Sequence, residues 1–496
     1  MSRPALNRTL FPGPAVPPER VLQFGEGNFL RAFVDWQIDG MNKKGLFTGG
    51  VVVIQPIEKG TVGVLNGQDG LYTLIERGIW DGKPIERRTL ISAVRRGLDP
   101  YTHWDQLMEF ARRPEVRFVF SNTTEAGIAY VPVPFPGRLC PATFPAKLAA
   151  FLHERYRHFS GAADRGLLVF PCELIDGNGR VLKACLVRHA RDWGLEGGFL
   201  EWLDRHNRFY DTLVDRIVPG YPAADAEKLE AELGYRDDLM VCSELHHFWA
   251  IQGDASARSE LPLTEAGFNV RWTEDLTPFR LLKVRILNGA HTLVAIPALL
   301  AGRETVGECV RDPLIGSFLR TGIYGEILPT LDLPEIEKAA YAGSVLERLA
   351  NPFLEHRLAG IALNSVSKFR VRVLPSLLEY RERTGAVPPL CSFSLAALIA
   401  FYTGARPAGL ALPGSAPGKK PAVEDEPPVL AKFIRVRALS DPVAVCRDIL
   451  GDGELWGFDL GSIPGLADQV IRSYGEILTR GAEQAMRRMV AAGEPT

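Results

Sequence analysis

Three side chains that could do acid–base chemistry lie close together in one apolar stretch of the chain. Lys283, Asn288 and His291 are separated by five and by three residues. At about 100° per helical residue they fall within an arc of roughly 140°, with His291 between the other two. One helix face could therefore direct a proton carrier, an amide and an imidazole to the same place. A lysine held against apolar surroundings loses proton affinity and can act as an acid or a base near neutral pH.

The same triplet would also fit a solvated helix edge beside a buried histidine. The catalytic interpretation therefore needs support from a second pattern. Near the N-terminus, an apolar strand over residues 21–25 runs into a turn that holds Gly25 and Gly27. Two such glycines permit a close approach of the backbone to a pyrophosphate, at the start of a helix. Leu30 replaces the third glycine of the dinucleotide fingerprint, and Gln55 stands where an acid would bind a ribose hydroxyl. A tight turn that binds nothing is the alternative.

The elements around these patterns predict two domains in a chain of 496 residues. Up to about residue 130, short apolar strands alternate with helical patterns, which is typical of a parallel sheet covered by helices on both faces. An antiparallel hairpin inserted in this sheet is expected to turn at Asp81 and Gly82. From about residue 275 strand signals nearly vanish, and helices are expected over residues 281–301, 312–324, 352–368, 392–402 and 465–491. The predicted class is α/β, with a Rossmann-like N-terminal domain over residues 1–274 and a mainly α-helical domain over residues 275–496; residues 404–428 are expected to form a surface loop.

Composition narrows the possible partners. The net charge is −2 and no basic block is present, which argues against nucleic acid. The N-terminus lacks the apolar core of a signal peptide, and the longest apolar stretch, residues 395–402, is too short to span a bilayer. Seven scattered cysteines favour a reducing, cytoplasmic compartment. The pair His246 and His247 has no third ligand nearby in the sequence, so no metal site is expected.

Several blocks, taken in order, resemble the mannitol dehydrogenase family of polyol-specific long-chain dehydrogenases/reductases. The resemblance covers nearly the whole chain and is greatest to the uronate-reducing branch. It rests on the glycine turn, on the spacing of the lysine motif, and on the blocks at residues 24–33, 121–127, 212–219, 351–353 and 363–376.

This resemblance implies an NAD-dependent, metal-independent enzyme that interconverts D-tagaturonate and D-altronate. Lys283 would be the general acid/base, Asn288 would stabilise negative charge on the substrate oxygen, and His291 would orient the substrate. The residues expected to bind NAD are Gly25, Gly27, Asn28, Phe29, Gln55, Thr123 and Glu125. Those expected to bind the sugar acid are Asn178, Arg216, Lys368 and Arg372. Lys368 and Arg372 also share one helical face with Asn364, although that spacing alone would equally suit a solvated stripe.

One departure from the family pattern concerns a pair of residues, Asp-Asn, that often follows a strand. Here Glu173 and Leu174 occupy those positions. The amide that would assist Asn288 is therefore missing, and Asn178 or a main-chain N–H would have to replace it. The alternatives that stay open are a mannitol- or fructuronate-type dehydrogenase, an NAD-binding sugar-acid isomerase or epimerase, and a nucleotide-binding regulatory protein. The residues by themselves do not decide between NAD and NADP, nor do they give the oligomeric state.

Overall fold

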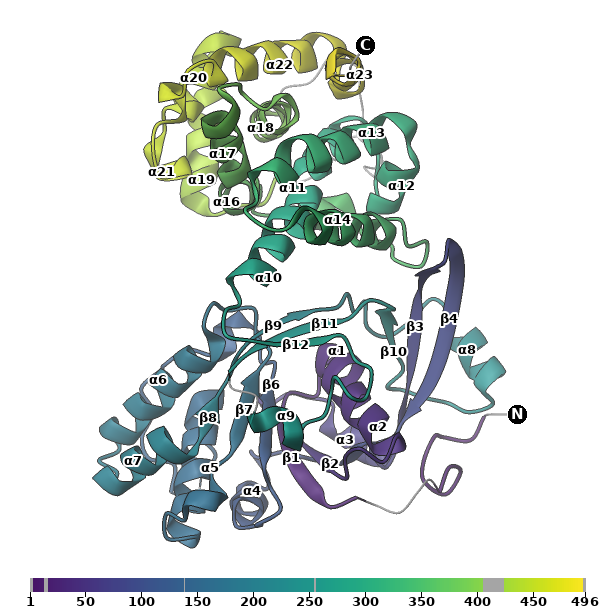
Figure 1. Ribbon diagram of the computed structural model, residues 1–496, viewed down its shortest axis with the longest axis vertical. Coiled ribbons are helices and arrows are strands. Elements are labelled where there is room, and N and C mark those ends of the chain that lie inside the picture. The colour runs from purple at the N-terminus through teal and green to yellow at the C-terminus, as the bar shows by residue number, and fades with distance from the viewer. Residues whose placement is uncertain (1–2, 13–16, 138, 254–255, 405–422, 494–496) are drawn as a thin grey trace. The chain divides into compact units, whose positions relative to one another are not determined.

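The computed structural model describes residues 3–12, 17–137, 139–253, 256–404 and 423–493, apart from the side chains of residues 125 and 491–493. The chain divides into two compact units. Unit 1 comprises Met1–Gly78 and Ile85–Leu276, and unit 2 comprises Ile79–Pro84 and Thr277–Thr496. Figure 1 shows the ribbon of both units.

Unit 1 is built on a six-stranded sheet in which all the strands are parallel. Its order is β5–β2–β1–β6–β7–β8. This is the order of the doubly wound dinucleotide-binding sheet, in which ligands bind at the carboxyl ends of the central strands. The Rossmann-like prediction is thus confirmed. The strand bounds are β1 Glu19–Phe24, β2 Gly50–Ile54, β5 Val94–Leu98, β6 Phe118–Ser121, β7 Leu168–Pro171 and β8 Arg208–Phe209.

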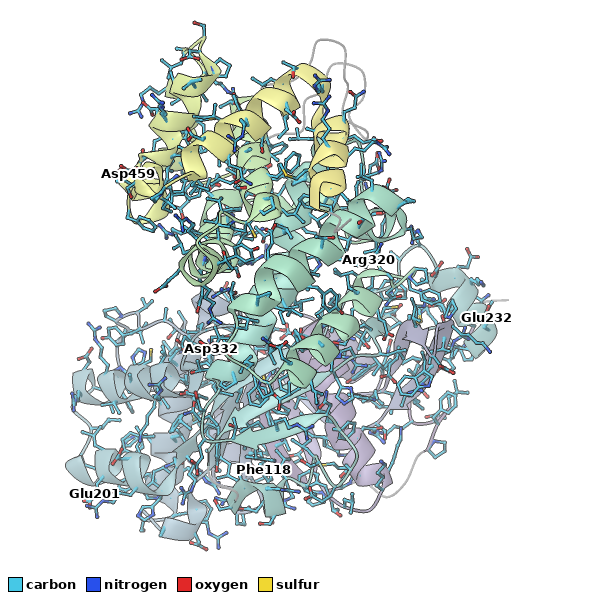
Figure 2. All side chains as sticks on the ribbon, turned by 45° about the horizontal axis from the view of Figure 1, so that its top comes forward. Phe118, Glu201, Glu232, Arg320, Asp332 and Asp459 are labelled. Atoms are coloured by element: carbon cyan, nitrogen blue, oxygen red, sulfur yellow. The ribbon has the colours of Figure 1, made fainter. Side chains whose placement is uncertain are left out.

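Both faces of this sheet are buried because its strands are apolar at successive positions. Phe118 packs into one hydrophobic cluster and its neighbour Val119 into another. Figure 2 labels Phe118 inside unit 1 and Glu201 and Glu232 on surface helices. The helices of unit 1 are α1 Asn28–Leu30, η1 Arg31–Asp35, α2 Trp36–Lys43, α3 Val62–Gly67, α4 Trp104–Ala111, η2 Glu125–Gly127, α5 Phe144–His158, η3 Ala163–Arg165, α6 Asn178–Asp192, α7 Gly197–His206, α8 Ala226–Leu233 and α9 Ser256–Glu260.

Two three-stranded sheets complete the β-structure of the described residues. One has the order β12–β11–β9, and the other β10–β3–β4. The hairpin β3–β4 turns at Asp81 and Gly82, whose φ values are 50° and 69°, as a two-residue turn with left-handed residues requires. The hairpin was expected within the parallel sheet, but β3 pairs with β10 instead. The bounds are β3 Tyr72–Trp80, β4 Lys83–Ile91, β9 Asp211–Asp215, β10 Val241–Glu244, β11 Phe248–Gln252 and β12 Val270–Thr273.

Apart from the hairpin residues Ile79–Pro84, the described part of unit 2 consists mainly of helices around one apolar core. Its two most buried helices are α11 and α18; every residue of α11 is buried, since it is apolar on nearly all sides. In Figure 1, α18 lies among α11, α17 and α22. Within the described ranges, no helix combines the length and apolar character needed to cross a bilayer. The bounds are α10 Thr277–Leu281, η4 Leu282–Asn288, α11 Gly289–Leu300, α12 Val306–Arg311, α13 Pro313–Thr321, η5 Gly322–Ile327, η6 Leu328–Thr330, α14 Glu335–Leu349, α15 Leu358–Ile361, α16 Ser365–Arg372, α17 Leu374–Thr384, α18 Pro389–Thr403, α19 Pro427–Val436, α20 Pro442–Leu450, α21 Gly453–Trp456, η7 Leu460–Ser462, α22 Leu466–Arg480 and α23 Ala482–Gly493.

The sequence patterns located some of these helices and missed others. The helix expected over residues 352–368 is in fact two, α15 and α16, because Asn364 adopts a φ of 51° between them. The helix α14 was not expected. Most of the loop expected over residues 404–428 lies outside the described residues.

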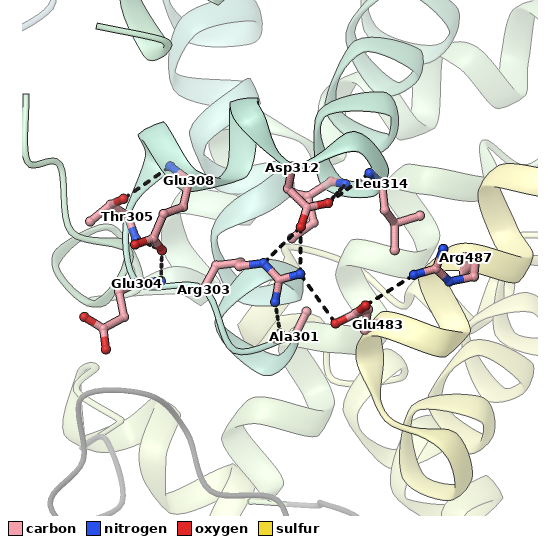
Figure 3. A network of polar contacts seen from close by, with 10 residues as sticks. Ala301, Arg303, Glu304, Thr305, Glu308, Asp312, Leu314, Glu483 and Arg487 are labelled. Carbon is pink, nitrogen blue, oxygen red and sulfur yellow. Dashed lines mark hydrogen bonds and ion pairs between the residues drawn. The ribbon is translucent and has the colours of Figure 1, made fainter. Parts of the chain in front are cut away.

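A polar network joins the start of α13 to α23 within unit 2 (Figure 3). Arg303 donates two hydrogen bonds to Asp312 Oδ2, at 3.1 and 2.6 Å. The same guanidinium lies 3.5 Å from a carboxylate oxygen of Glu483 on α23. A capping box formed by Thr305 and Glu308 begins the neighbouring α12. These contacts fix the ends of helices that pack around α11.

Candidate functional site

The backbone of the turn after β1 lies close to the loop that follows β6. Gly25 has a φ of +123°, and a Cβ there would lie 3.1 Å from both the carbonyl oxygen of Asn122 and a methyl group of Leu30. A side chain at this position would push the turn away from the loop that follows β6. A Cβ on Gly27 would meet no atom within 4 Å, so the turn is open on that side. Gly27 also precedes an unbroken helical run over residues 28–43, whose first N–H groups are suited to an anion.

A cleft of about 470 Å³ lies over this turn, at the carboxyl ends of β1, β2 and β6. This is the edge at which a doubly wound sheet binds its ligand. A larger cavity of about 590 Å³ lies near the amino ends of the strands, so size alone does not identify the site. The cleft is lined by Gly25, Glu26, Gly27, Pro56, Ile57, Asn122, Thr123, Thr124, Ala126, Gly127, Ala129, Val131, Ala142, Thr143 and Phe144.

Three of the residues expected to bind the coenzyme line this cleft: Gly25, Gly27 and Thr123. Three others make contacts elsewhere. Asn28 accepts a 2.7 Å hydrogen bond from Arg31, Phe29 stacks on Phe33, and Gln55 donates to the Glu58 carbonyl at 3.0 Å. The side chain of Glu125 is outside the described part of the chain.

Glu173, which stood out as a departure from the family pattern, holds the loop that lines the cleft. Glu173 is 2% exposed. One oxygen accepts hydrogen bonds from Thr123 N and Thr123 Oγ1, at 2.9 and 3.0 Å, and the other accepts from Ser121 Oγ at 3.0 Å. Burial raises the pKa of Glu173, although these donors oppose the shift. The sequence marked this position but gave no sign of its partners. Leu174 beside it is exposed.

A buried lysine connects the two walls at the other end of the cleft. Lys147 Nζ donates to the carbonyl oxygens of Pro56 and Ala142, at 3.2 and 3.0 Å, and to the Tyr101 hydroxyl at 3.0 Å. Burial lowers the pKa of Lys147 to about 8. Pro56 and Ala142 both line the cleft, so this ammonium group fixes the distance between the walls. The sequence gave no signal for Lys147, because its partners Pro56 and Tyr101 are 91 and 46 residues away along the chain.

Asn178 and Arg216, which were expected to bind the substrate, are structural in unit 1. Asn178 is fully buried, donates to the carbonyl oxygens of Pro171, Glu173 and Thr212, and accepts from two backbone N–H groups. Its amide has no capacity left for a ligand. Arg216 donates to two backbone carbonyls, forms a 2.5 Å ion pair with Glu76 and lies over the ring of Trp36. Packing thus uses the polar groups of both residues within unit 1, and their assignment to substrate binding stays a prediction.

In unit 2, the lysine motif lies on a helix that contains a π-turn. The run α10–η4–α11 is continuous, and Lys283 and Asn288 are both in the π-helical segment. In this segment hydrogen bonds join residues five apart, as shown by the bond from the Gly289 N–H to the Val284 carbonyl. Residues five apart therefore lie closer to one line along the helix than they do in an α-helix. The arc of 140° expected for a regular helix is thus too wide, and the π-turn brings Lys283 and Asn288 closer to one line. Both side chains are half-buried.

His291 is held neutral in the next turn of the same helix. It is 7% exposed, and its Nε2 has no hydrogen-bond partner among the described residues. Burial and the neighbouring positive charges lower its pKa to about 3. The ring of His356 lies 4.8 Å away, edge to face. Burial and Lys368 lower the pKa of His356 as well. Two neutral imidazoles thus adjoin the motif.

Cationic side chains from two further helices surround these imidazoles. Arg348 of α14 and Arg372 of α16 act electrostatically on His291, and Lys368 of α16 acts on His356. Lys368 Nζ donates to the Ile361 carbonyl at 2.9 Å. Burial lowers the pKa of Arg372 and of Lys368, with Asp425 as an opposing carboxylate for Lys368. The structure thus brings Lys368 and Arg372 together with His291, and it adds Arg348 and His356, for which the sequence gave no signal.

A glycine allows α16 to approach the lysine helix. A Cβ on Gly289 would lie 3.3 Å from the Arg372 carbonyl oxygen. The small residue that follows Asn288 therefore keeps Arg372 beside the motif. This cluster can hold an anion next to a proton carrier. In the parts of the chain that are described, no group of three His, Cys, Asp or Glu side chains is arranged to hold a metal ion.

Unit 1 is thus a doubly wound unit with a glycine turn, and unit 2 is a helical unit that carries the lysine motif. The model of the mannitol dehydrogenase Rossmann domain matches residues 19–265, and that of the mannitol dehydrogenase C-terminal domain matches residues 275–478. The chain belongs to the mannitol dehydrogenase family, as its sequence blocks led us to expect, and it is an oxidoreductase that acts on a secondary alcohol.

Curated relatives match at nearly full length. The altronate oxidoreductase of Halalkalibacterium halodurans is 44% identical over 476 residues, which cover 95% of this chain and 93% of the relative. The altronate oxidoreductase of Klebsiella pneumoniae is 44% identical over 489 residues, or 97% of this chain and 99% of the relative.

Solved structures show the same fold at lower identity. The mannitol 2-dehydrogenase of Pseudomonas fluorescens, in a ternary complex with NAD and D-mannitol, is 21% identical with a TM-score of 0.72, covering 98% of this chain and 99% of that one. A substrate-free D-sorbitol dehydrogenase is 22% identical with a TM-score of 0.79, covering 97% and 100%.

Proposed function

We propose that this protein is an NAD-dependent oxidoreductase that interconverts D-tagaturonate and D-altronate without a metal ion. The names of the full-length relatives support the substrate pair. The observation that carries the proposal is the cationic cluster of Arg348, Lys368 and Arg372 beside the lysine motif, because a sugar acid, unlike a neutral polyol, brings a carboxylate. Seven unpaired thiols support a reducing, cytoplasmic compartment.

The cleft of unit 1 fits a dinucleotide. The open face of Gly27 leaves room for a pyrophosphate, and the helical run that follows offers N–H groups to it. Thr123, fixed by Glu173, lines the cleft near the ends of β1 and β6. When bound, NAD supplies the hydride chemistry. The mannitol 2-dehydrogenase of Pseudomonas fluorescens, which shares this fold, holds NAD in its ternary complex, and this supports the choice of coenzyme.

The protein's own residues handle the proton. Lys283 donates a proton from Nζ to the ketone oxygen as the carbonyl carbon is reduced, and it accepts the hydroxyl proton in the reverse direction. Asn288 donates a hydrogen bond to the same oxygen and stabilises its developing negative charge. The π-turn, which brings residues five apart closer to one line, supports a joint role for the two side chains. His291, neutral and with an unpartnered Nε2 among the described residues, is suited to orient a substrate hydroxyl.

The substrate carboxylate is bound by Lys368 and Arg372, with Arg348 adding positive charge. Arginine offers a two-pronged donor and lysine a point charge. Their position on α16, beside Gly289, supports binding of the carboxylate at a fixed distance from the lysine motif. We no longer include Asn178 or Arg216 in this role.

The test is NADH oxidation with D-tagaturonate and with D-tagatose, the neutral ketose that lacks the carboxylate. Arg372→Ala should reduce kcat/KM for tagaturonate by about 10- to 100-fold, as expected for a lost charge-assisted contact, and change tagatose turnover little. Arg370→Ala is the matched control, since Arg370 is exposed on the same helix two residues away. Equal losses for both substrates would remove the carboxylate role.

The lysine assignment has its own test. Lys283→Ala should lower turnover steeply, leave NADH binding nearly unchanged, and recover part of its activity when a small primary amine is added. Near-normal turnover in this variant would discard the assignment. D-fructuronate and D-fructose, run in parallel, separate the related mannitol- and fructuronate-type activities. If none of these substrates consumes NADH although the coenzyme binds, a non-redox isomerase or epimerase becomes the better interpretation.

A further inference from the structure

The end of β2 lacks the acid that usually marks an NAD site. In doubly wound domains a carboxylate there accepts a hydrogen bond from the adenosine ribose, and this contact disfavours the phosphate of NADP. Here β2 ends at Ile54 and Gln55 follows. Gln55 is 5% exposed, and its amide nitrogen donates a 3.0 Å hydrogen bond to the Glu58 carbonyl oxygen. The usual position therefore presents no carboxylate to the coenzyme.

Another carboxylate reaches this place from the glycine turn. Glu26 stands between Gly25 and Gly27, and it lines the cleft together with Pro56 and Ile57. Its Oε1 accepts a hydrogen bond from the Thr61 N–H at 3.3 Å, which places the side chain over the loop after β2. A Cβ on Gly60 would lie 2.2 Å from the same oxygen. Glycine at residue 60 thus makes room for this carboxylate.

The second carboxylate oxygen of Glu26 lacks a hydrogen-bond donor within the described residues, which is the evidence for a ligand at this place. Oε2 is buried and has no hydrogen-bond partner among the residues that the structure describes. A carboxylate can only accept hydrogen bonds, and a buried oxygen without a donor costs free energy. Burial correspondingly raises the pKa of Glu26. A hydroxyl group of a ligand in the cleft would supply the missing donor, whereas a phosphate would bring repulsion instead.

We propose that Glu26 replaces the missing acid of β2, accepts a hydrogen bond from the adenosine 2′-hydroxyl of NAD, and thereby selects NAD over NADP. This inference rests on the proposed function, since it presupposes a dinucleotide in the cleft. The residue that would distinguish NAD from NADP thus lies in the turn after β1. The backbone of that turn would bind the pyrophosphate, and its one acidic side chain, Glu26, would bind the ribose.

The experiment measures dissociation constants of NADH and NADPH without substrate, by the fluorescence of the bound coenzyme. Wild type should prefer NADH. Glu26→Gln removes the charge and adds a donor, so NADPH should bind about 10-fold tighter and NADH about 10-fold more weakly. Glu58→Gln is the control, because Glu58 is an exposed carboxylate of the same loop. It should leave the preference unchanged.

A second measurement starts from the wild-type protein, so that part of the test does not depend on how the variant folds. NADH that lacks the adenosine 2′-hydroxyl should bind about 10-fold more weakly than NADH, and this difference should vanish in Glu26→Gln. Equal binding of the two coenzymes by wild type, or an unchanged preference in Glu26→Gln, overturns the inference and leaves the proposed function standing. Failure of wild type to bind either coenzyme overturns both.

Discussion

Replacing Glu173 tests whether its acceptor geometry or its charge holds the loop that lines the coenzyme cleft. In Glu173→Ala, Thr123 N–H, the Thr123 hydroxyl and the Ser121 hydroxyl all lose their acceptor. Ser121 is 1% exposed, so its orphaned hydroxyl should cost about 1–3 kcal/mol. The Thr123 donors border the cleft, where water can replace the carboxylate. The expected loss in the free energy of unfolding is therefore about 2–4 kcal/mol.

Glu173→Gln should behave differently. Its carbonyl oxygen can accept both Thr123 bonds, and its NH₂ group can donate to Ser121 Oγ, because a hydroxyl also accepts. The lost charge weakens these bonds, but burial already disfavours the charged form, since it raises the pKa of Glu173. These effects oppose each other, so the net change should stay within about 1 kcal/mol.

Urea unfolding and NADH titration of both variants provide the assay. Glu173→Ala should unfold at lower urea and bind NADH more weakly, because Thr123 is no longer held, whereas Glu173→Gln should remain close to wild type in both. Leu174→Ala is the control, since Leu174 is the exposed neighbour, and it should change stability by less than about 0.5 kcal/mol. Equal destabilisation by Ala and Gln would refute the reasoning and show that the charge itself is needed.

Three further predictions concern residues outside direct contact with substrate. Arg216→Met should destabilise the protein by about 3–5 kcal/mol, measured by urea unfolding, because it leaves the Glu76 carboxylate buried without its ion pair; a large loss of kcat in the folded variant would instead restore Arg216 to the site. Gly25→Ala should cost about 1–3 kcal/mol of stability and weaken NADH binding, owing to its φ of +123°, whereas Gly63→Ala, in α3 with no atom within 4 Å of a Cβ, should be neutral or stabilising. Burial raises the pKa of Glu326 to about 7 from its usual 4.5, so the folded state holds this proton more tightly. The resulting stability is fully present below about pH 4.5 and is lost as the pH rises through about 7, which amounts to about 3 kcal/mol. Thermal unfolding across this range should show the decline, and Glu326→Gln should reduce its slope; an unchanged slope would contradict the assignment.

Comparison of the sequence with the structure shows where reasoning from patterns succeeded. The glycine turn, the buried strands and the hairpin turn at Asp81 and Gly82 were all predicted, because each depends on the backbone preferences of a few consecutive residues. The helical character of the C-terminal region was predicted for a similar reason, since strand-like alternation ends near residue 275. The spacing of Lys283, Asn288 and His291 was visible, but the π-turn that brings Lys283 and Asn288 closer to one line was not, because a single extra residue per turn leaves no clear mark on the hydrophobic pattern.

Polar residues were harder to interpret, and the reason is physical. An arginine that binds a substrate and one that holds a core together have the same side chain, and only its neighbours distinguish them. Arg216 meets Glu76, which is 140 residues away in the sequence, and Glu173 meets Thr123 at a separation of 50 residues. No local pattern predicts such pairs. The same holds for His356, which joins His291 only because the chain folds back within unit 2.

The sequence by itself thus determined the class of fold, the family and the lysine motif, since these follow from local backbone preferences and from the order of sequence blocks along the chain. Only the tertiary structure decided where each polar group finds its neighbours. It used Asn178 and Arg216 for internal hydrogen bonds, gathered Arg348, Lys368 and Arg372 around two neutral imidazoles, and left one oxygen of Glu26 without a partner among the described residues. The partners of these polar groups are distant in the sequence, because a buried polar group must be hydrogen-bonded wherever the fold provides a partner.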